Sequence, residues 1–233
     1  MQVSYQPVGN VAVNVAFGNE VDEEINAQVM ALGAAVQRAK LPGVGECVPT
    51  YAALLVHYDP LVTGYAAVAA ALEGLRQKSA AGQLAAQPGK LVELPVCYGG
   101  TYGEDLPFVA SHAGLSEEEV IKRHCGRAYR IFMLGFLPGF PYLGGMDEAL
   151  FTPRLENPRV KIPAGSVGIG GKQTGVYPLD SPGGWQLIGR TPYKLFDPEK
   201  GGKLPYAAGD RIRFVPITSA VFAEIEAGKG WRR

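Results

Sequence analysis

Apolar residues near the start of the chain alternate with smaller or polar ones, at Val11, Val13 and Val15. A period of two predicts a β-strand with one buried face. Residues 51–59, YAALLVHYD, form a second apolar stretch and predict another strand. The N-terminal part of the chain is therefore expected to contain a sheet.

Two other stretches have the helical period. Spacings of four, three and four predict a first helix, with apolar residues at Ile25, Val29, Leu32 and Val36. Asp22 stands where the N-cap of this helix is expected, and Leu41-Pro42-Gly43 is expected to end it. The second helix is predicted by Tyr65, Val68, Leu72 and Leu75. Together with the two strands, these helices indicate a small α/β unit.

The helical pattern gives way to small and polar residues over 79–90, SAAGQLAAQPGK. A stretch of this composition without a period is typical of a linker. We therefore expect an N-terminal α/β domain over residues 1–88 and a second domain over residues 89–233.

The pattern in the second domain favours strands. Strands are predicted over 91–100, 129–136 and 211–217, while Ser116 and Glu119 form a capping box for a short helix that reaches His124. Residues 135–202 hold fourteen of the 31 glycines and nine of the 18 prolines. Because glycine costs about 1 kcal/mol and proline about 3 kcal/mol inside a helix, this region is expected to consist of strands and shaped loops.

The composition narrows the classes of partner. Lys and Arg number 22, as do Asp and Glu, so no basic excess points to a nucleic acid. The three cysteines form no CxxC pair, which argues against a zinc site and, with no secretory signal, favours a cytoplasmic location. We expect no metal site, and no run of 18 apolar residues predicts a membrane span.

The stretch GIGGKQTG, residues 168–175, resembles a phosphate-binding loop but lacks its spacing. Gly171-Lys172 is followed by Gln173, so the hydroxyl of Thr174 comes one residue late. A glycine-rich strand or turn whose backbone approaches another group closely is the expected structure. Gln173, Thr174 and Tyr177 offer neutral donors and acceptors that suit a small amide or a carboxylate.

Arg154 and Arg159 each follow a proline, which fixes the local backbone. Two arginines held in this way could clamp a carboxylate or phosphate. The alternative is that they pair with Asp147, Glu148 or Glu156 on the surface. Nearby, residues 136–145, FLPGFPYLGG, form either an aromatic pocket wall or a packed Ω-type loop.

His124 is the candidate catalytic histidine. It closes the capped helix, where the helix C-terminus would favour its protonated form. A Ser-His-Asp arrangement would combine it with Ser166 or Ser181, but no G-x-S-x-G motif supports this. His57 is expected to be a core or edge residue and His112 to be solvated.

The motifs appear in a characteristic order: PVCYGG, LSEEEVIKRH, LGFLPGFPYLGG, PRLENPR, IPAGSVGIGGKQTGVYP, SPGGWQLIGRTPYKLFDP and AGDRIRFVPI. This series resembles the KipI/allophanate hydrolase subunit 1 family, and the similarity covers nearly the whole chain. The resemblance implies an α+β protein in which a small α/β domain precedes a cyclophilin-like β-barrel domain. It does not imply prolyl isomerase activity, because fold alone does not fix function.

Within the family, the resemblance is greatest to the bacterial branch that acts on 5-oxoproline. It implies a component of an ATP-dependent 5-oxoprolinase that works with 5-oxoprolinase subunits C and A to convert 5-oxo-L-proline into L-glutamate. ATP and its Mg²⁺ would be held by this chain or by its partners. The matching positions imply catalytic roles for His124, Arg154 and Arg159. Substrate-binding roles are implied for Gln173, Thr174, Tyr177 and Arg190.

The family leaves two alternatives open. One is a KipI-type inhibitor of a sporulation histidine kinase. The other is the allophanate hydrolase or urea branch. Because the sequence contains no A-M-K-M biotin site, we expect a separate subunit rather than a fusion to a carboxylase.

Overall fold

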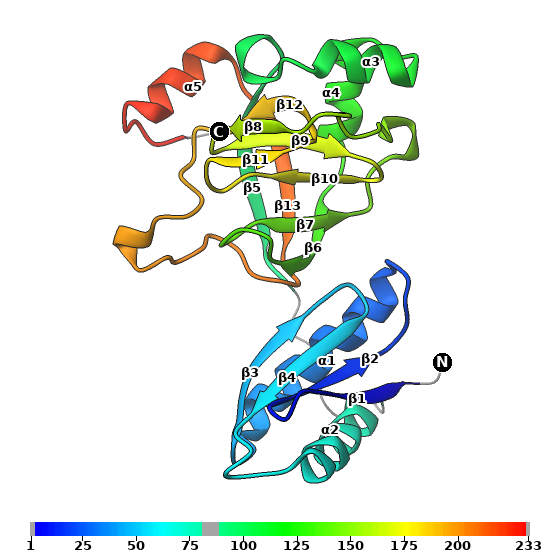
Figure 1. Ribbon diagram of the computed structural model, residues 1–233. Coiled ribbons are helices and arrows are strands. Elements are labelled where there is room, and N and C mark those ends of the chain that lie inside the picture. The colour runs from blue at the N-terminus through cyan, green and yellow to red at the C-terminus, as the bar shows by residue number, and fades with distance from the viewer. Residues whose placement is uncertain (1–2, 81–88, 232–233) are drawn as a thin grey trace. The chain divides into compact units, whose positions relative to one another are not determined.

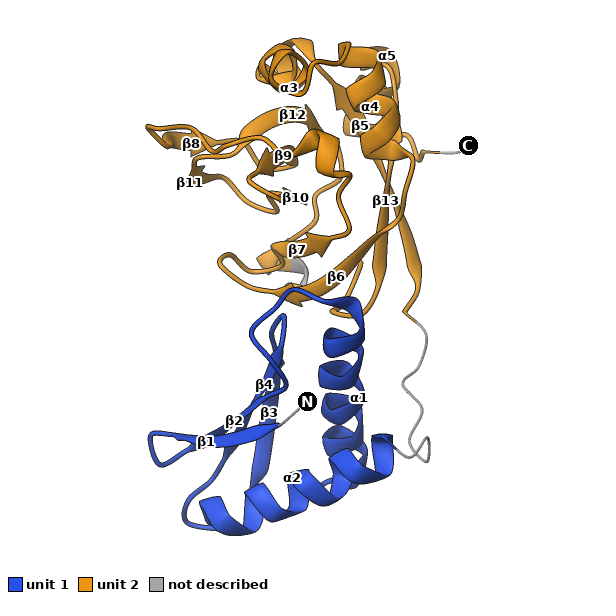
Figure 2. Ribbon diagram, turned by 90° about the vertical axis from the view of Figure 1, so that its right-hand side faces the viewer, with its two compact units in different colours: residues 1–88 blue, residues 89–233 orange. Residues whose placement is uncertain are grey.

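A computed structural model describes residues 3–80 and 89–231. They divide into two compact units, residues 1–88 and 89–233, which Figure 2 shows in different colours. Most of the predicted linker, residues 81–88, lies outside the described residues. Helices and strands occur in both units, which confirms the α+β class.

Unit 1 contains a four-stranded antiparallel sheet in the order β1-β2-β4-β3. Its strands are β1 (Ser4–Val8), β2 (Ala12–Ala16), β3 (Val44–Pro49) and β4 (Ala53–Tyr58). Helices α1 (Glu23–Ala39) and α2 (Tyr65–Ala80) pack against each other and against the sheet (Figure 1). Val13, Val15 and the large buried apolar residues of both helices form one core.

The ends of α1 follow the sequence signals. Asp22 is the N-cap, and its carboxylate accepts bonds from the backbone N–H groups of Glu24 and Ile25 at 2.8 and 2.9 Å. The helix ends at Ala39, just before the predicted stop, and Lys40 follows in the left-handed region with φ 45°.

Strands β1 and β3 are not predicted by the sequence pattern. Both are edge strands of the sheet, and neither has a regular alternation of buried and exposed residues. Pro7 in β1 and Gly45 in β3 weaken the strand signal further. Pairing with a central strand, rather than local pattern, therefore determines these two elements.

Unit 2 is built on a closed barrel of seven strands in the order β10-β7-β6-β13-β5-β12-β9. These are β5 (Leu91–Tyr98), β6 (Tyr129–Leu134), β7 (Pro141–Gly144), β9 (Ser166–Gly170), β10 (Gln173–Val176), β12 (Gln186–Arg190) and β13 (Arg211–Pro216). Strands β5 and β13 pair in parallel, and the other neighbours pair antiparallel. A separate two-stranded sheet joins β8 (Arg159–Ile162) to β11 (Ser181–Gly183).

Three α-helices gather at one end of the barrel: α3 (Leu106–Ala113), α4 (Glu117–Cys125) and α5 (Ser219–Glu226) (Figures 1 and 2). Helix α4 begins as predicted, because the Ser116 hydroxyl accepts the backbone N–H of Glu119. Helices α3 and α5 are not predicted by the sequence pattern. As expected from its glycine and proline content, residues 135–202 contain strands and two short 3-10 helices, η2 (Glu148–Leu150) and η3 (Pro198–Lys200). A third 3-10 helix, η1 (Gly100–Tyr102), precedes α3.

Candidate functional site

A cluster of aromatic residues packs separately from the core inside the barrel. This Trp185 cluster consists of Phe140, Ile162, Tyr177, Trp185 and Leu187. The rings of Phe140, Tyr177 and Trp185 meet edge to face, with centroids 5.3 to 6.1 Å apart and interplanar angles of 74 to 77°. Rings at these separations stabilise one another beyond simple burial, so the cluster forms a rigid base.

The glycines of GIGGKQTG make room for Trp185. Strands β9 and β10 form a hairpin in which Gly170 pairs with Gln173 across the two-residue turn Gly171-Lys172. Gly171 has φ 63°, a conformation that favours glycine. A Cβ at Gly170 would overlap the indole of Trp185, and one at Gly175 would lie 3.0 Å from it. The stretch is therefore a hairpin against an aromatic ring and not a phosphate-binding loop.

Arg154 lies over this base. Its guanidinium carbon is 5.8 Å from the centroid of the Trp185 ring, a cation–π arrangement. The segment that carries it is fixed on both sides, because Leu155 N–H donates to Gly184 O at 2.7 Å and Gln186 Nε2 donates to Pro153 O at 3.0 Å. Arg154 is exposed, and within residues 3–80 and 89–231 it forms no ion pair. It is therefore positioned to receive an anion.

Arg159 has a different environment. Its guanidinium bonds to Asp105 at 2.8 Å and to Glu104 at 3.0 Å, and it also donates to Trp185 O at 3.3 Å. The alternative that Arg159 pairs with Asp147, Glu148 or Glu156 is thus wrong: its partners Glu104 and Asp105 directly precede α3. Asp105 also accepts the Leu187 N–H at 2.6 Å, so this ion pair connects β8, β12 and the start of α3. Of the two arginines of the predicted clamp, Arg159 is thus already bound to two carboxylates.

The other predicted binding residues lie in β10, directly after it, or at the end of β12. Tyr177 is buried in the Trp185 cluster, and burial raises its pKa to about 12, although Arg154 and Arg159 oppose the shift. Its phenol is therefore neutral at physiological pH. Gln173 is half-buried at the start of β10. Arg190 donates from Nε to Ala164 O at 3.0 Å and so holds the turn before β9, where Gly165 N–H donates to Tyr177 O at 2.7 Å.

His124 and Thr174 meet inside the barrel, where both side chains are fully buried. His124 Nε2 lies 2.8 Å from Thr174 Oγ1, and Nδ1 lies 2.8 Å from the Tyr98 hydroxyl. Burial lowers the pKa of His124 to about 3. The expectation that the helix end favours a protonated His124 is therefore wrong, because loss of hydration outweighs the helix dipole. With both ring nitrogens bonded in this way, a triad with Ser166 or Ser181 is also excluded in this arrangement.

Two features of the described chain bear on whether it could hold ATP. The glycine hairpin leads into a strand rather than a helix, so it lacks the helix N-terminus that holds phosphates in a P-loop. A groove of about 680 Å³ between residues 192–205 and 225–231 carries three lysines, Lys194, Lys203 and Lys229. Two of them already pair with carboxylates, Lys194 with Asp197 at 3.0 Å and Lys229 with Glu224 at 3.5 Å. The hairpin thus lacks the features of a P-loop, and two of the three groove lysines are ion-paired.

Two other features are absent from the described part of the chain. No helix among residues 3–80 and 89–231 is long and apolar enough to cross a membrane. The same residues contain no group of three or more His, Cys, Asp or Glu side chains arranged to hold a metal ion.

Comparison with known proteins identifies the family. Residues 3–205 match the model of the carboxyltransferase domain, subdomain C and D. The chain belongs to this family. Among curated members, it is 42% identical over 231 residues to the B subunit of 5-oxoprolinase from Bacillus subtilis, an alignment that covers 94% of this chain and 95% of that protein. The Escherichia coli O157:H7 protein of the same name is 54% identical over 132 residues, which cover 57% of this chain and 61% of that protein. The resemblance drawn from the order of motifs is thus confirmed.

Solved structures of similar proteins have the same fold. TTHA0988 superposes with a TM-score of 0.78 at 39% identity over 89% of this chain, which spans only 40% of that longer chain. PH0987 from Pyrococcus horikoshii is 46% identical, and the superposition covers 94% of this chain and 100% of the PH0987 chain with a TM-score of 0.56. The K. lactis urea amidolyase, at 20% identity and a TM-score of 0.73, shares the fold over 97% of this chain and 16% of its own.

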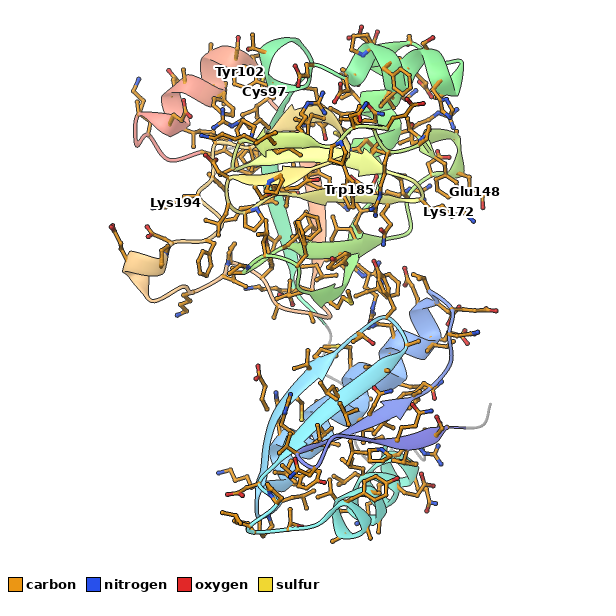
Figure 3. All side chains as sticks on the ribbon, in the orientation of Figure 1. Cys97, Tyr102, Glu148, Lys172, Trp185 and Lys194 are labelled. Atoms are coloured by element: carbon orange, nitrogen blue, oxygen red, sulfur yellow. The ribbon has the colours of Figure 1, made fainter. Side chains whose placement is uncertain are left out.

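The sequence pattern gives no role to the central residue of the site. SPGGW has the composition of a turn before a strand, and nothing in that stretch singles out Trp185. The available signal is the alternation of glycines at 168 and 170 in one strand and 175 in the next. Alternate positions of a strand share a face, so these glycines mark a flat surface that must accommodate a large ring. Figure 3 shows Trp185 on the β9–β10 side of the barrel, with Lys172 toward one edge and Lys194 at the opposite edge.

Proposed function

We propose that this chain is the B subunit of an ATP-dependent 5-oxoprolinase that, together with subunits A and C, hydrolyses 5-oxo-L-proline to L-glutamate. One observation carries the proposal: the 42% identity to the B subunit of the Bacillus subtilis 5-oxoprolinase extends over almost the full length of both chains. Because the similar protein is named as one subunit of an enzyme, we assign the activity to the complex of subunits and not to this chain alone. A cytoplasmic location is part of the same proposal.

Arg154 is the residue best placed to bind the substrate. 5-Oxo-L-proline is a five-membered lactam with one carboxylate, and an exposed guanidinium held over an aromatic ring suits that carboxylate. Gln173 pairs with Gly170, the glycine against Trp185, and supplies an amide of the kind that recognises a lactam. Tyr177 and Arg159 hold the base on which Arg154 rests, and Arg190 supports a neighbouring turn.

The reaction adds water across the lactam C–N bond. The carbonyl carbon gains the hydroxyl group and the ring nitrogen gains a proton, which yields glutamate. ATP supplies the driving force. Because the glycine hairpin of this chain is not a P-loop, we place ATP and its Mg²⁺ on the partner subunits. The contribution proposed for this chain is to orient the substrate.

A set of Arg154 variants tests this assignment in the assembled complex. Arg154→Ala should raise KM for 5-oxo-L-proline about 10-fold to 100-fold, since it removes a charge-assisted hydrogen bond worth about 1.5–3 kcal/mol. Arg154→Lys should recover part of the loss, because it keeps the charge but not the planar fork. Arg38→Ala, at an exposed position at the end of α1, is the matched control. Unchanged KM in Arg154→Ala would remove Arg154 from the site.

The urea branch is the second candidate. It is favoured by the urea amidolyase of Lachancea kluyveri, which is 26% identical over 249 residues covering 93% of this chain but only 13% of that protein. Supplying urea and bicarbonate in place of 5-oxo-L-proline distinguishes the two. ADP release that depends on urea would favour this branch.

A further inference from the structure

The polar side chains inside the barrel form a chain of hydrogen bonds in which the donor and the acceptor of each bond can be assigned. Thr174 Oγ1 donates to Gly168 O at 3.1 Å. A hydroxyl carries one proton, so Thr174 must accept from His124 at the 2.8 Å contact. His124 therefore carries its proton on Nε2. Because the ring is neutral, Nδ1 is an acceptor and receives the Tyr98 hydroxyl proton at 2.8 Å.

The hydrogen-bond chain continues at the other end and is enclosed by aromatic rings. Cys125 Sγ donates to the Tyr98 oxygen at 3.3 Å. The imidazole of His124 stacks on Phe214, with centroids 4.7 Å apart and planes inclined by 24°. The Tyr129 hydroxyl donates to the His124 backbone carbonyl at 2.8 Å. Both nitrogens of the imidazole are thus bonded, and the side chain is fully buried.

The last link of this hydrogen-bond chain lies in the hairpin that supports Trp185. Thr174 pairs with Ile169, and Gly175 pairs with Gly168. Side chains alternate across a strand, so Thr174, Ile169 and Val176 face the barrel interior while Gly168, Gly170 and Gly175 face the indole. The contact from His124 to Thr174 therefore fixes the inner face of the hairpin whose outer face carries the Trp185 cluster.

We propose that His124 is a positioning residue that, through Thr174, fixes the β9–β10 hairpin and with it the Trp185 base beneath Arg154, and that it transfers no proton to or from substrate. Glycine-rich strands have few side chains to hold their register. A buried, directed hydrogen-bond chain supplies that constraint from the inside. The kinetic part of this inference rests on the proposed function, whereas the structural part does not.

Two pairs of variants test the structural part. In each pair, one variant keeps the hydrogen-bonding group and the other removes it. The amide nitrogen of Gln reaches the position of Nε2, so His124→Gln keeps a donor to Thr174. The amide of Asn reaches only the position of Nδ1, so His124→Asn keeps the Tyr98 contact and loses Thr174. In the same way Thr174→Ser keeps the hydroxyl, and Thr174→Val removes it at nearly constant shape. Thr174→Val carries the test if His124→Asn does not fold.

Fluorescence of Trp185 is the first readout. The sequence has two tryptophans, so the variants are made in a Trp231→Phe background. We expect His124→Asn and Thr174→Val to show a red-shifted emission and stronger quenching by acrylamide, while His124→Gln and Thr174→Ser match the parent. Identical emission and quenching in all four variants would overturn the proposal, because the hairpin would not depend on the hydrogen-bond chain.

Turnover by the complex with subunits A and C is the second readout. A positioning role predicts that His124→Gln retains most activity and the wild-type pH profile, whereas His124→Asn raises KM for 5-oxo-L-proline. A proton-transfer role predicts that both variants lose about 10²-fold to 10⁴-fold in kcat and that one limb of the pH profile disappears. The latter result would overturn the proposal. If the wild-type complex makes no glutamate, the proposed function fails, and the fluorescence result alone decides the role of His124.

Discussion

At the scale of single residues, the site depends on the difference in size between glycine and tryptophan. Trp185 can lie flat on the β9–β10 hairpin because Gly170 and Gly175 present no side chain to it. The guanidinium carbon of Arg154 lies 5.8 Å from the centroid of the same ring. Hydrogen bonds that fix the hairpin come from the interior, where His124 is neutral because it is fully buried.

Substitution of Gly170 by alanine should disrupt this packing. Its Cβ would overlap the indole ring, and overpacking of this kind costs about 1–3 kcal/mol of the free energy of unfolding. Gly74 in α2 is the control, because nothing lies within 4 Å of a Cβ placed there. Gly74→Ala should stabilise by about 0.5–1 kcal/mol. Denaturant unfolding measures both changes, and equal stabilities for the two variants would contradict the packing described.

The lowered pKa of His124 predicts a loss of stability in acid. In the unfolded chain the imidazole binds a proton near pH 6.5, whereas in the folded chain it does so only near pH 3. Between these values the unfolded state binds more protons, so the free energy of unfolding falls as the pH falls, by up to about 1.4 kcal/mol per pH unit. The titratable groups that face His124 are Tyr98, Cys125 and Tyr129, and burial raises the pKa of each, so they stay neutral in this range.

His124→Gln removes this titration and keeps the donor to Thr174. The comparison is the free energy of unfolding of the wild type and of His124→Gln between pH 5 and pH 7.5. We expect the difference between the two proteins to change with pH in favour of the variant as the solution becomes more acid. Parallel curves would show that the pKa of His124 is the same in the folded and the unfolded protein, which would contradict the lowered pKa.

At the scale of elements, one ion pair connects parts of the chain far apart in sequence. Asp105, at the N-terminus of α3, bonds both the Arg159 guanidinium in β8 and the Leu187 N–H in β12. The side chain of Asp105 is 13% exposed and that of Arg159 is 24% exposed. Solvent therefore screens this pair less than the pairs at the surface.

A double-mutant cycle measures the strength of this connection. Asp105→Ala, Arg159→Ala and the double variant should give a coupling energy of about 1–3 kcal/mol, as for hydrogen bonds to charged groups. The exposed pair Lys161–Asp180, at 2.9 Å with side chains 70% and 53% exposed, should give less than about 1 kcal/mol. A coupling at Asp105–Arg159 no larger than at the control would mean that the pair does not hold these elements together.

Elements with a strong local signal could be predicted from the sequence, and elements fixed by distant partners could not. Asp22 and Ser116 cap their helices as expected, because a cap is a local interaction. The edge strands β1 and β3 exist through pairing with central strands, which leaves little trace in their own pattern. The site follows the same division: Arg154 could be singled out from its own segment, but its support by Trp185 joins residues 31 positions apart in the sequence.

At the scale of the whole molecule, each unit has a hydrophobic core of its own. The core of unit 1 is formed by its sheet and two helices, and that of unit 2 fills the barrel. A separate core is the physical condition for independent folding. We therefore predict that residues 89–233, expressed alone, fold and show the same Trp185 emission as the full chain. An emission spectrum typical of a molten globule would contradict this prediction. So would the unfolding of both units together when the chain is cleaved between them.

The central claim is that this chain is an essential component of a 5-oxoprolinase. The most direct measurement is the release of glutamate and ADP from 5-oxo-L-proline and ATP by purified subunits A and C with this chain, and again without it. We predict that both products form only when this chain is present. Equal product in its absence would contradict the claim, as would no product from the three proteins once their folding and assembly have been verified.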